Sequence, residues 1–320
     1  MAEPIESQCR VGVVLPAAYP ELAGGGGPWL ERLGRVLEDD FFGAVEVSQV
    51  TDDRVRREAR AALDGAGVDV VFAAQPAILG RKLDLNAADL AERRHAVEAC
   101  KGQIDQAYEL GARIMMVMSG PDPGEEQRAE ARERLVDSLK QLCQFAGERA
   151  EDYLLAISLE NFDRSIDKRR LIGPTKEAAQ VVEAVRTEYS TCGLTLDLSH
   201  QPQIGETIAD MIVDGADNLI HAHFGNCVIS DPQHPSYGDQ HPPFGVPGSE
   251  IGIEELRLYL ESLIYCGFFA RSVPTSMPVL SMEIRPRPGE SSALVIANGK
   301  RALKYAWARL SHDRWAEGRI

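Results

Sequence analysis

The chain has 320 residues, of which 44% are hydrophobic and 26% are charged, and its formal net charge is -15. This length and composition predict a globular protein with a large buried core and exclude a disordered chain. The negative charge argues against a nucleic-acid partner and against an acidic membrane surface, because binding to either requires an excess of Lys and Arg.

The sequence also lacks the usual signals for a membrane or an export pathway. No apolar run approaches the roughly 18 residues that a membrane-spanning helix needs. The segment 1–10 is polar and does not resemble a secretory signal. The six cysteines are scattered without any Cys-x-x-Cys pair, which excludes a zinc knuckle and predicts reduced, mostly buried thiols. We therefore expect a cytoplasmic protein.

Short apolar runs alternate with amphipathic, charged runs along the whole chain. The apolar runs predict eight strands, at 10–16, 44–48, 69–75, 112–120, 154–161, 194–200, 219–226 and 279–284. The amphipathic runs predict helices at 28–39, 52–63, 86–110, 121–150, 175–189 (capped by Thr175), 204–213, 253–265 and 291–310. Eight strand–helix pairs without a linker predict an α/β fold, a single (β/α)8 TIM barrel over residues 1–320.

One long segment, at about 224–252, interrupts this alternation after the seventh strand. It has no periodicity and is rich in Pro, Gly and His. A loop of this length inside a compact domain usually serves a function, so we expect a lid that contributes substrate contacts. His241 or Tyr237 could supply a general acid or base from this loop; the alternative is a rim loop used for oligomer contacts.

Ionisable residues stand at the ends of four consecutive predicted strands. They are Glu160, Asp197, His223 and Glu283. Because the carboxyl ends of all barrel strands meet at one face, we expect these side chains to converge. Any one of them alone would be read as an ordinary buried polar residue, but together they predict a binding site for one divalent metal. Three carboxylates and one imidazole favour Mn²⁺, with Mg²⁺ or Co²⁺ as alternatives, over a structural zinc.

Other polar residues lie near the four predicted ligands. His200, three residues after Asp197, is expected to hydrogen-bond substrate oxygens during catalysis or to support the ligands. His221 points to the same side as His223 by the period of two, so it is predicted to contact substrate or to support the metal.

Three residues next to or two positions after the ligands could bind substrate hydroxyls: Asn161, Asn226 and Arg285. For Arg285, an ion pair at the barrel rim is an equal alternative. Binding of a phosphorylated sugar would require several basic residues near the last two strands, where only Arg285 and Arg287 are available. A neutral sugar is therefore favoured.

These residues and their spacing resemble the xylose-isomerase-like barrels, the sugar isomerase and epimerase superfamily. The motifs of that superfamily are a Glu, Asp-x-x-His, His-x-His and a Glu on strands five to eight. Here they are Glu160, Asp197 with His200, His221 with His223, and Glu283. The resemblance implies the metal ligands Glu160, Asp197, His223 and Glu283. It also implies that Glu160 and Glu283 move the proton, one on each face of the substrate, as in the ketose epimerases.

The expected reaction is removal of a proton next to the carbonyl of a keto-sugar through a metal-stabilised enediolate. The outcome is isomerisation, epimerisation, or β-elimination of an aglycone from a 3-oxo-glycoside. The ketose epimerases carry an arginine about six residues after the strand-seven histidine, where this chain has Ile229. Because of this difference, a second subgroup of the superfamily is also a candidate, the catalytic α-subunits of bacterial C-glycoside deglycosidases. They resemble this chain in their barrel and metal ligands, and they work with a small β-subunit. We accordingly expect a homo-oligomer or a hetero-oligomer with such a subunit.

Two other classes remain as alternatives. A metal-dependent endonuclease can use the same fold, but the apurinic-site enzymes hold three zinc ions with more His ligands, and the charge of -15 counts against DNA binding. A non-catalytic carbohydrate-binding subunit would not depend on the four ligands. Trp307 and Trp315 near the end of the chain indicate either an assembly surface or packing on the barrel itself.

Overall fold

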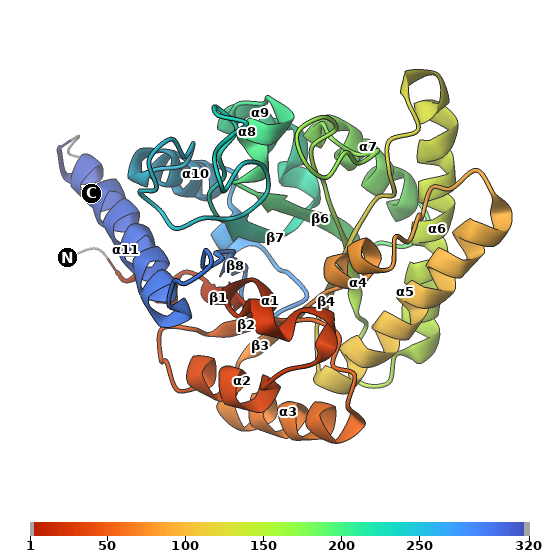
Figure 1. The fold of residues 1–320 in the computed structure, drawn as a ribbon, viewed down its shortest axis with the longest axis horizontal. Coiled ribbons are helices and arrows are strands. Elements are labelled where there is room, and N and C mark those ends of the chain that lie inside the picture. The colour runs from red at the N-terminus through yellow and green to blue at the C-terminus, as the bar shows by residue number, and fades with distance from the viewer. Residues whose placement is uncertain (1–2, 317–320) are drawn as a thin grey trace.

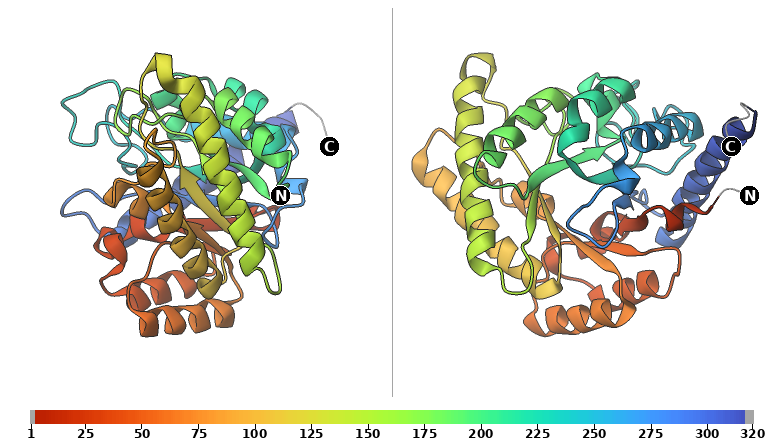
Figure 2. Two further views of the ribbon diagram at one scale, coloured as in Figure 1. Left: turned by 90° about the vertical axis from the view of Figure 1, so that its right-hand side faces the viewer. Right: turned by 180° about the vertical axis from the view of Figure 1, so that it is seen from behind.

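A computed structural model describes residues 3–316, with side chains to residue 310. Eight parallel strands form a closed barrel in the order β1 to β8, and helices surround it (Figures 1 and 2). The strands are β1 (Arg10–Val14), β2 (Ala44–Val47), β3 (Asp69–Ala73), β4 (Ile114–Met118), β5 (Ala156–Glu160), β6 (Cys192–Asp197), β7 (Leu219–Phe224) and β8 (Val279–Met282). The predicted single (β/α)8 barrel is confirmed.

The helices follow the predicted order with more short pieces than expected. They are α1 (Leu15–Ala18), α2 (Trp29–Leu37), α3 (Asp53–Ala66), α4 (Gln75–Gly80), α5 (Leu90–Leu110), α6 (Arg128–Arg149), α7 (Thr175–Arg186), α8 (His200–Ile204), α9 (Ile208–Gly215), α10 (Ile253–Tyr265) and α11 (Ser292–Ala316). The 3-10 turns are η1 (Ile5–Ser7), η2 (Pro20–Gly25), η3 (Glu125–Gln127), η4 (Ala216–Asn218) and η5 (Phe268–Ala270). The short helix α1 begins directly after β1, and α4 begins two residues after the last residue of β3. The sequence analysis had assigned the first residues of both helices to the preceding strands.

Two predicted helices differ from the observed ones for local reasons. The helix expected from residue 121 begins at Arg128, because Pro121, Pro123 and Gly124 do not continue a helix. The helix expected over 204–213 is two helices, separated where Gly205 adopts a left-handed φ of 81° and Thr207 starts a capping box.

Thr175 is the first residue of α7 and does not cap it. Pro174 occupies the N-cap position, and no side chain caps this helix. The Thr175 hydroxyl instead donates to Glu206 Oε2 at 2.6 Å, and its amide donates to Glu206 Oε1 at 2.8 Å.

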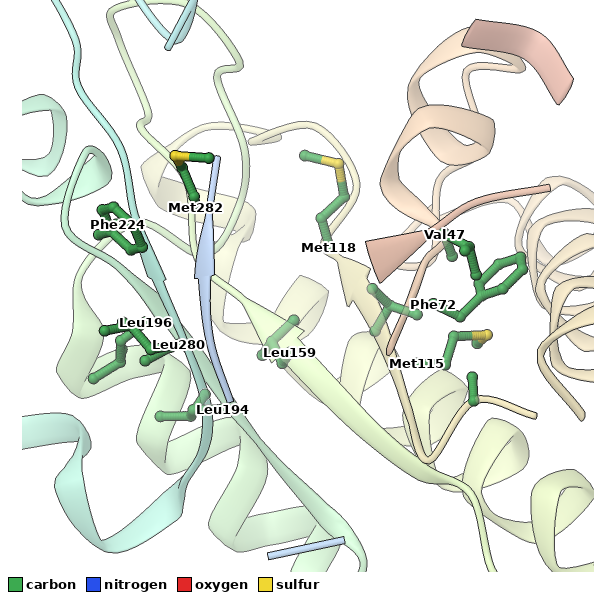
Figure 3. Close-up of a cluster of buried hydrophobic side chains, with 14 of the residues drawn as sticks. Val47, Phe72, Met115, Met118, Leu159, Leu194, Leu196, Phe224, Leu280 and Met282 are labelled. Atoms are coloured by element: carbon green, nitrogen blue, oxygen red, sulfur yellow. The ribbon is translucent and has the colours of Figure 1, made fainter. Parts of the chain in front are cut away.

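The main core lies between the barrel and its helices. It contains the outward-facing strand residues, among them Val47, Phe72, Met115, Leu159, Leu194, Phe224, Leu280 and Met282 (Figure 3). Inside the barrel, a separate small apolar cluster includes Ala44, Val71, Ile114 and Met116 of β2 to β4 together with Ala156 of β5 and Val279 of β8. β5 to β8 also carry buried polar residues at inward positions, namely Ser158, Glu160, Thr195, Asp197, His221, His223 and Ser281. The inward polar side chains of these strands are therefore concentrated on β5 to β8, apart from Glu46 of β2.

The segment between β7 and α10 contains no helix or strand, as the sequence predicts. Asn226 fastens it at both ends: its Oδ1 accepts from the Cys227 and Ile251 amides at 2.9 Å, and its Nδ2 donates to Pro243 O at 3.3 Å. The loop is therefore anchored next to the strand ends.

All six cysteines are free, and five of them are buried, in agreement with the prediction of reduced thiols. Trp307 packs edge-on against Phe269, and its indole donates to Glu3 O at 2.8 Å. Trp307 thus packs on its own barrel, whereas the side chain of Trp315 lies outside the described residues. No helix within residues 3–316 has both the length and the apolar character needed to cross a membrane.

The shell around β5 gives a test of the fold. Leu159 is fully buried there, so we expect Leu159→Ala to lower the free energy of unfolding by about 2–5 kcal/mol. Leu294, on α11, is 69% exposed, and Leu294→Ala should change it by less than about 0.5 kcal/mol. Urea unfolding followed by circular dichroism measures both. Equal effects of the two substitutions would contradict this packing.

Candidate metal centre

The four predicted ligands meet at the carboxyl ends of four consecutive strands. Glu160 ends β5, Asp197 ends β6, His223 lies in β7, and Glu283 directly follows β8. One ligand atom from each lies within 4.8 Å of all the others. His223 Nδ1 is 3.5 Å from Glu160 Oε1, 3.9 Å from Asp197 Oδ2 and 3.1 Å from Glu283 Oε2. The structure thus brings the predicted set to one point.

Three atoms of this set are buried and form no hydrogen bond: Glu160 Oε1, Asp197 Oδ2 and His223 Nδ1. Buried polar atoms are nearly always paired in proteins, because leaving one unpaired costs the free energy of its desolvation. The atoms lie close to one another, and together with a Glu283 oxygen they form a set suited to a hard or borderline divalent cation. The residues therefore fit a metal ion.

The charges of the cluster shift the pKa values of its members. Burial and the neighbouring carboxylate of Glu283 raise the pKa of Glu160 above its usual value, although imidazoles oppose this. Burial also favours the neutral form of Glu283, but His241 and His223 outweigh it and lower the pKa of Glu283 to about 2. Burial lowers the pKa of His223, yet the carboxylates of Glu46 and of the ligands raise it well above 6.5. Positive charge is thus favoured at this point.

Two residues that the sequence analysis did not single out contact the ligands directly. Glu46, fully buried in β2, accepts from His223 Nε2 through both oxygens, at 2.7 and 3.0 Å. Gln75, the first residue of α4, donates to Glu160 Oε2 at 2.6 Å. The signal for Glu46 was its charge inside the otherwise apolar second strand, while Gln75 carried no comparable signal.

His200 and His221 are both buried. His200 Nδ1 donates to Asn161 O at 2.9 Å, and its Nε2 lies 3.6 Å from Asp197 Oδ2. Burial lowers the pKa of His200, but Asp197, Asp239 and Glu160 outweigh it and raise the pKa to about 10. His221 lies below His223 inside the barrel and does not line the cavity at the site. Its position fits support of the centre and not the predicted substrate contact.

The predicted hydroxyl-binding residues divide into two groups. The amides of Asn161 and Asn226 are used within the protein, since Asn161 Nδ2 donates to Gly173 O at 2.8 Å and Asn226 fastens the long loop. Neither asparagine lines the cavity, and a substrate contact for either stays a prediction. Arg285 is exposed, lines the cavity, and has no ion pair among the described side chains, which leaves its guanidinium available for a ligand.

The long loop places His241 and Asp239 beside the predicted ligands. His241 Nε2 is 3.4 Å from Glu283 Oε1 and 3.0 Å from Asp239 Oδ1. Asp239 Oδ1 is also 3.2 Å from His200 Nε2, and its Oδ2 pairs with Lys168 Nζ at 3.0 Å. Neither Asp239 nor Lys168 was predicted. Tyr237 is half-buried and does not line the cavity.

Ligand atoms of Asp197, His200 and His241 form a further group within 4.8 Å of one another. The Nε2 atoms of His200 and His241 each lie at hydrogen-bond distance from Asp239 Oδ1. When these nitrogens carry protons, Asp239 is their acceptor, so this group does not need a metal ion to explain it.

The cavity at the site has a volume of about 140 Å³ and two unlike walls. One wall is charged, with Glu160, His223, Glu283 and His241. The other is apolar and comes from α1, α4 and neighbouring strands and loops, with Pro16, Ala17, Pro76, Leu79, Met116 and Phe162. A molecule that fills it would place a polar group at the predicted metal and an apolar face on the opposite side.

The fold and the ligand set define a (β/α)8 barrel whose mouth can hold a metal ion. A family model described as xylose isomerase-like TIM barrel matches residues 37–279, and the chain belongs to this family. No protein of curated function matches the chain significantly by sequence.

Three solved structures share this fold. An L-ribulose 3-epimerase aligns with a TM-score of 0.67 at 18% identity, over 97% of this chain and 97% of that chain. The IolI protein with a binding zinc atom has a TM-score of 0.68 at 15% identity, over 94% and 98%. The 3-keto-D-glucoside 4-epimerase YcjR from E. coli has a TM-score of 0.61 at 16% identity, over 95% and 99%. At these identities the likeness establishes the fold.

The raised pKa of His223 predicts that metal uptake expels a proton. Below that pKa the proton occupies the imidazole and competes with the ion, so metal affinity should rise with pH and level off above it. Calorimetric titration with Mn²⁺ at pH 7 in two buffers of different ionisation enthalpy should give about one proton released per ion, or more. Equal heats in both buffers would contradict the assignment of His223 as a ligand.

Proposed function

We propose that this protein is a metal-dependent enzyme that removes a proton next to the carbonyl of a keto-sugar. The observation that carries the proposal is the group of three buried ligand atoms without hydrogen bonds, from Glu160, Asp197 and His223, with Glu283 beside them. Such an arrangement is costly unless an ion compensates it. Two proteins with this fold, an L-ribulose 3-epimerase and a 3-keto-D-glucoside 4-epimerase, are sugar epimerases, which supports the same class of chemistry here.

Glu160 and Glu283 are the residues that we assign to proton transfer. Both line the cavity, and they come from strands three apart around the barrel. Two carboxyl groups within reach of one substrate can serve as a general base and a general acid. We therefore assign one of them to removal of the proton and the other to its return.

Mn²⁺ is the ion that we propose for the centre, with Mg²⁺ or Co²⁺ as alternatives. Three carboxylates and one imidazole form an oxygen-rich set, which suits these ions. IolI was solved with zinc in the same fold, so zinc belongs among the ions to be tested. When bound, the ion would act as a Lewis acid that polarises the substrate carbonyl. Gln75 would hold Glu160 in place through its hydrogen bond to Glu160 Oε2.

The substrate that we favour is a 3-oxo-glycoside, with a free ketose as the alternative. The apolar wall, with Leu79, Met116 and Phe162, suits an aglycone better than the hydroxyls of a free sugar. Ile229 stands where the ketose epimerases carry an arginine. Elimination of the aglycone, as in C-glycoside deglycosidase α-subunits, would follow from the same proton abstraction. On this proposal the protein works with a small β-subunit or as a homo-oligomer.

The net charge of the chain distinguishes the alternative of a DNA endonuclease from the proposed sugar enzyme. An enzyme that binds a DNA backbone needs a basic surface, whereas this chain carries a net charge of -15. An assay with abasic-site DNA and added zinc tests it directly. The alternative of a non-catalytic carbohydrate-binding subunit predicts that sugar binding survives loss of the four ligands.

Proton NMR in D₂O with the Mn²⁺-loaded enzyme, chelated before recording, distinguishes the outcomes. A free ketohexose and a 3-oxo-glycoside of a phenol are offered separately. Release of the phenol supports the eliminating enzyme, and deuterium in the ketohexose together with a new epimer supports the epimerase. If neither substrate changes at any metal loading, including in the presence of a candidate β-subunit, the proposed proton abstraction is wrong.

Substitution of the two glutamates should separate chemistry from folding. We expect Glu160→Gln and Glu283→Gln each to lower turnover by about 10²–10⁴-fold, because the amide cannot carry the proton. The exposed Glu58→Gln on α3 serves as the matched control and should leave turnover unchanged. Metal content is measured alongside, so that loss of the ion is distinguished from loss of the acid or base. Full turnover in both site variants would remove these residues from catalysis.

A further inference from the structure

Glu46 is a fully buried carboxylate that none of the proposed chemical steps uses. It belongs to β2, on the side of the barrel whose interior is otherwise apolar. Its register partners on the neighbouring strands are Val14 and Val71. Burying a charge among such neighbours costs several kcal/mol unless it is compensated. The compensation comes from β7, across the barrel interior, where His221 and His223 approach its two oxygens.

We propose that Glu46 is a positioning residue of the metal centre, which fixes His223 so that Nδ1 faces the ion. Glu46 contacts only the Nε2 side of His223, whereas the carboxylates of Glu160 and Glu283 lie beside Nδ1. An N–H on Nε2 that is donated to a carboxylate leaves the lone pair on Nδ1 and makes the imidazole a stronger ligand. The inference rests on the proposed metal-dependent function and adds a residue that none of its steps requires.

A second ring holds Glu46 in this position. His221 Nε2 lies 3.1 Å from Glu46 Oε1, and its Nδ1 lies 3.3 Å from Thr195 Oγ1. The Thr195 hydroxyl in turn pairs with Ser158 Oγ at 2.7 Å. A buried polar chain from β5 to β7 thus sets the orientation of Glu46.

Glu46 is better explained as a hydrogen-bond acceptor than as a ligand of a second ion. The contact between Glu46 Oε1 and His223 Nε2 is 2.7 Å, a charge-assisted hydrogen-bond distance. Two ligand atoms that each lie about 2.0–2.2 Å from a tetrahedral zinc ion would be separated by roughly 3.3 Å. The short contact therefore leaves no space for an ion between them.

The test uses the zinc-loaded protein, because zinc is diamagnetic and its release can be followed with a chromophoric chelator. We expect Glu46→Gln and Glu46→Leu to release zinc about 10–100-fold faster than wild type. Release starts from the ion-bound state, in which Nδ1 carries no proton, so competition by protons does not enter. Ser138→Ala removes a buried hydroxyl on α6 that donates to Leu85 O, outside this chain, so it is the matched control and should release zinc at nearly the wild-type rate.

A spectroscopic readout separates positioning from a general effect of charge. In zinc-loaded wild type, the Nε2 proton of His223 should give a strongly downfield, slowly exchanging NMR signal, because it is donated to a buried carboxylate. Both Glu46 variants should move this signal upfield or lose it by exchange. If Glu46→Leu does not fold, Glu46→Gln, which keeps the shape and one acceptor, carries the test.

The outcomes distinguish this inference from the proposed function. If wild type binds no divalent ion, the proposed function fails at that step, and Glu46 has no centre to position. If wild type binds zinc and the Glu46 variants release it at the wild-type rate, the positioning role is overturned. Faster release with an unchanged Nε2 signal would assign the effect to charge alone and would also overturn it. Binding of two ions by wild type and one by the variants would make Glu46 a ligand.

Discussion

The interaction on which the rest of this structure depends is the burial of negative charge at one end of the barrel. Glu46, Glu160, Asp197 and Asp239 are each at most 5% exposed. Imidazoles and one lysine lie among them, yet several ligand atoms still have no partner. An uncompensated buried charge costs several kcal/mol. The buried charges of the centre therefore lower the stability of the fold, and a bound cation would offset part of that loss.

The barrel can carry this cost because its polar and apolar parts are separated. The shell between the strands and the helices is continuous and apolar all around the barrel. Inside, a small apolar cluster comes mainly from β2 to β4, with Ala156 of β5 and Val279 of β8, and the inward polar residues lie on β5 to β8 and at Glu46 of β2. Stability thus comes mainly from residues that never meet a substrate. The inward positions of β5 to β8 are left to hold side chains that would weaken an ordinary core.

The sequence predicts the fold and the ligand set because both depend on periodic or terminal positions. Strand–helix alternation gives the barrel, and a polar residue at the end of each of four strands marks its mouth. The positions of Gln75, Lys168 and Asp239 depend on how loops fold back over that mouth, which no local pattern records. The hydrogen bonds of Asn161 and Asn226 could not be predicted for the same reason, since their partners are loop carbonyls and amides. The roles of the ligands themselves remain predictions.

Two carboxylates from different parts of the chain each hold a pair of imidazoles near the centre. Glu46, in a barrel strand, contacts His223 and His221, whereas Asp239, in the long loop, contacts His200 and His241. His221, His223 and Glu46 all belong to barrel strands. Glu46 contacts the Nε2 side of His223, whereas Glu160 and Glu283 lie beside its Nδ1. Asp239 itself pairs with Lys168, and Asp239 and His241 line the cavity, whereas His200 does not. For the function that we propose, changes in the loop would therefore alter the groups around Asp239 and His241 without moving His223, the proposed metal ligand. The barrel would then keep the proposed proton transfer while the loop changed the substrate.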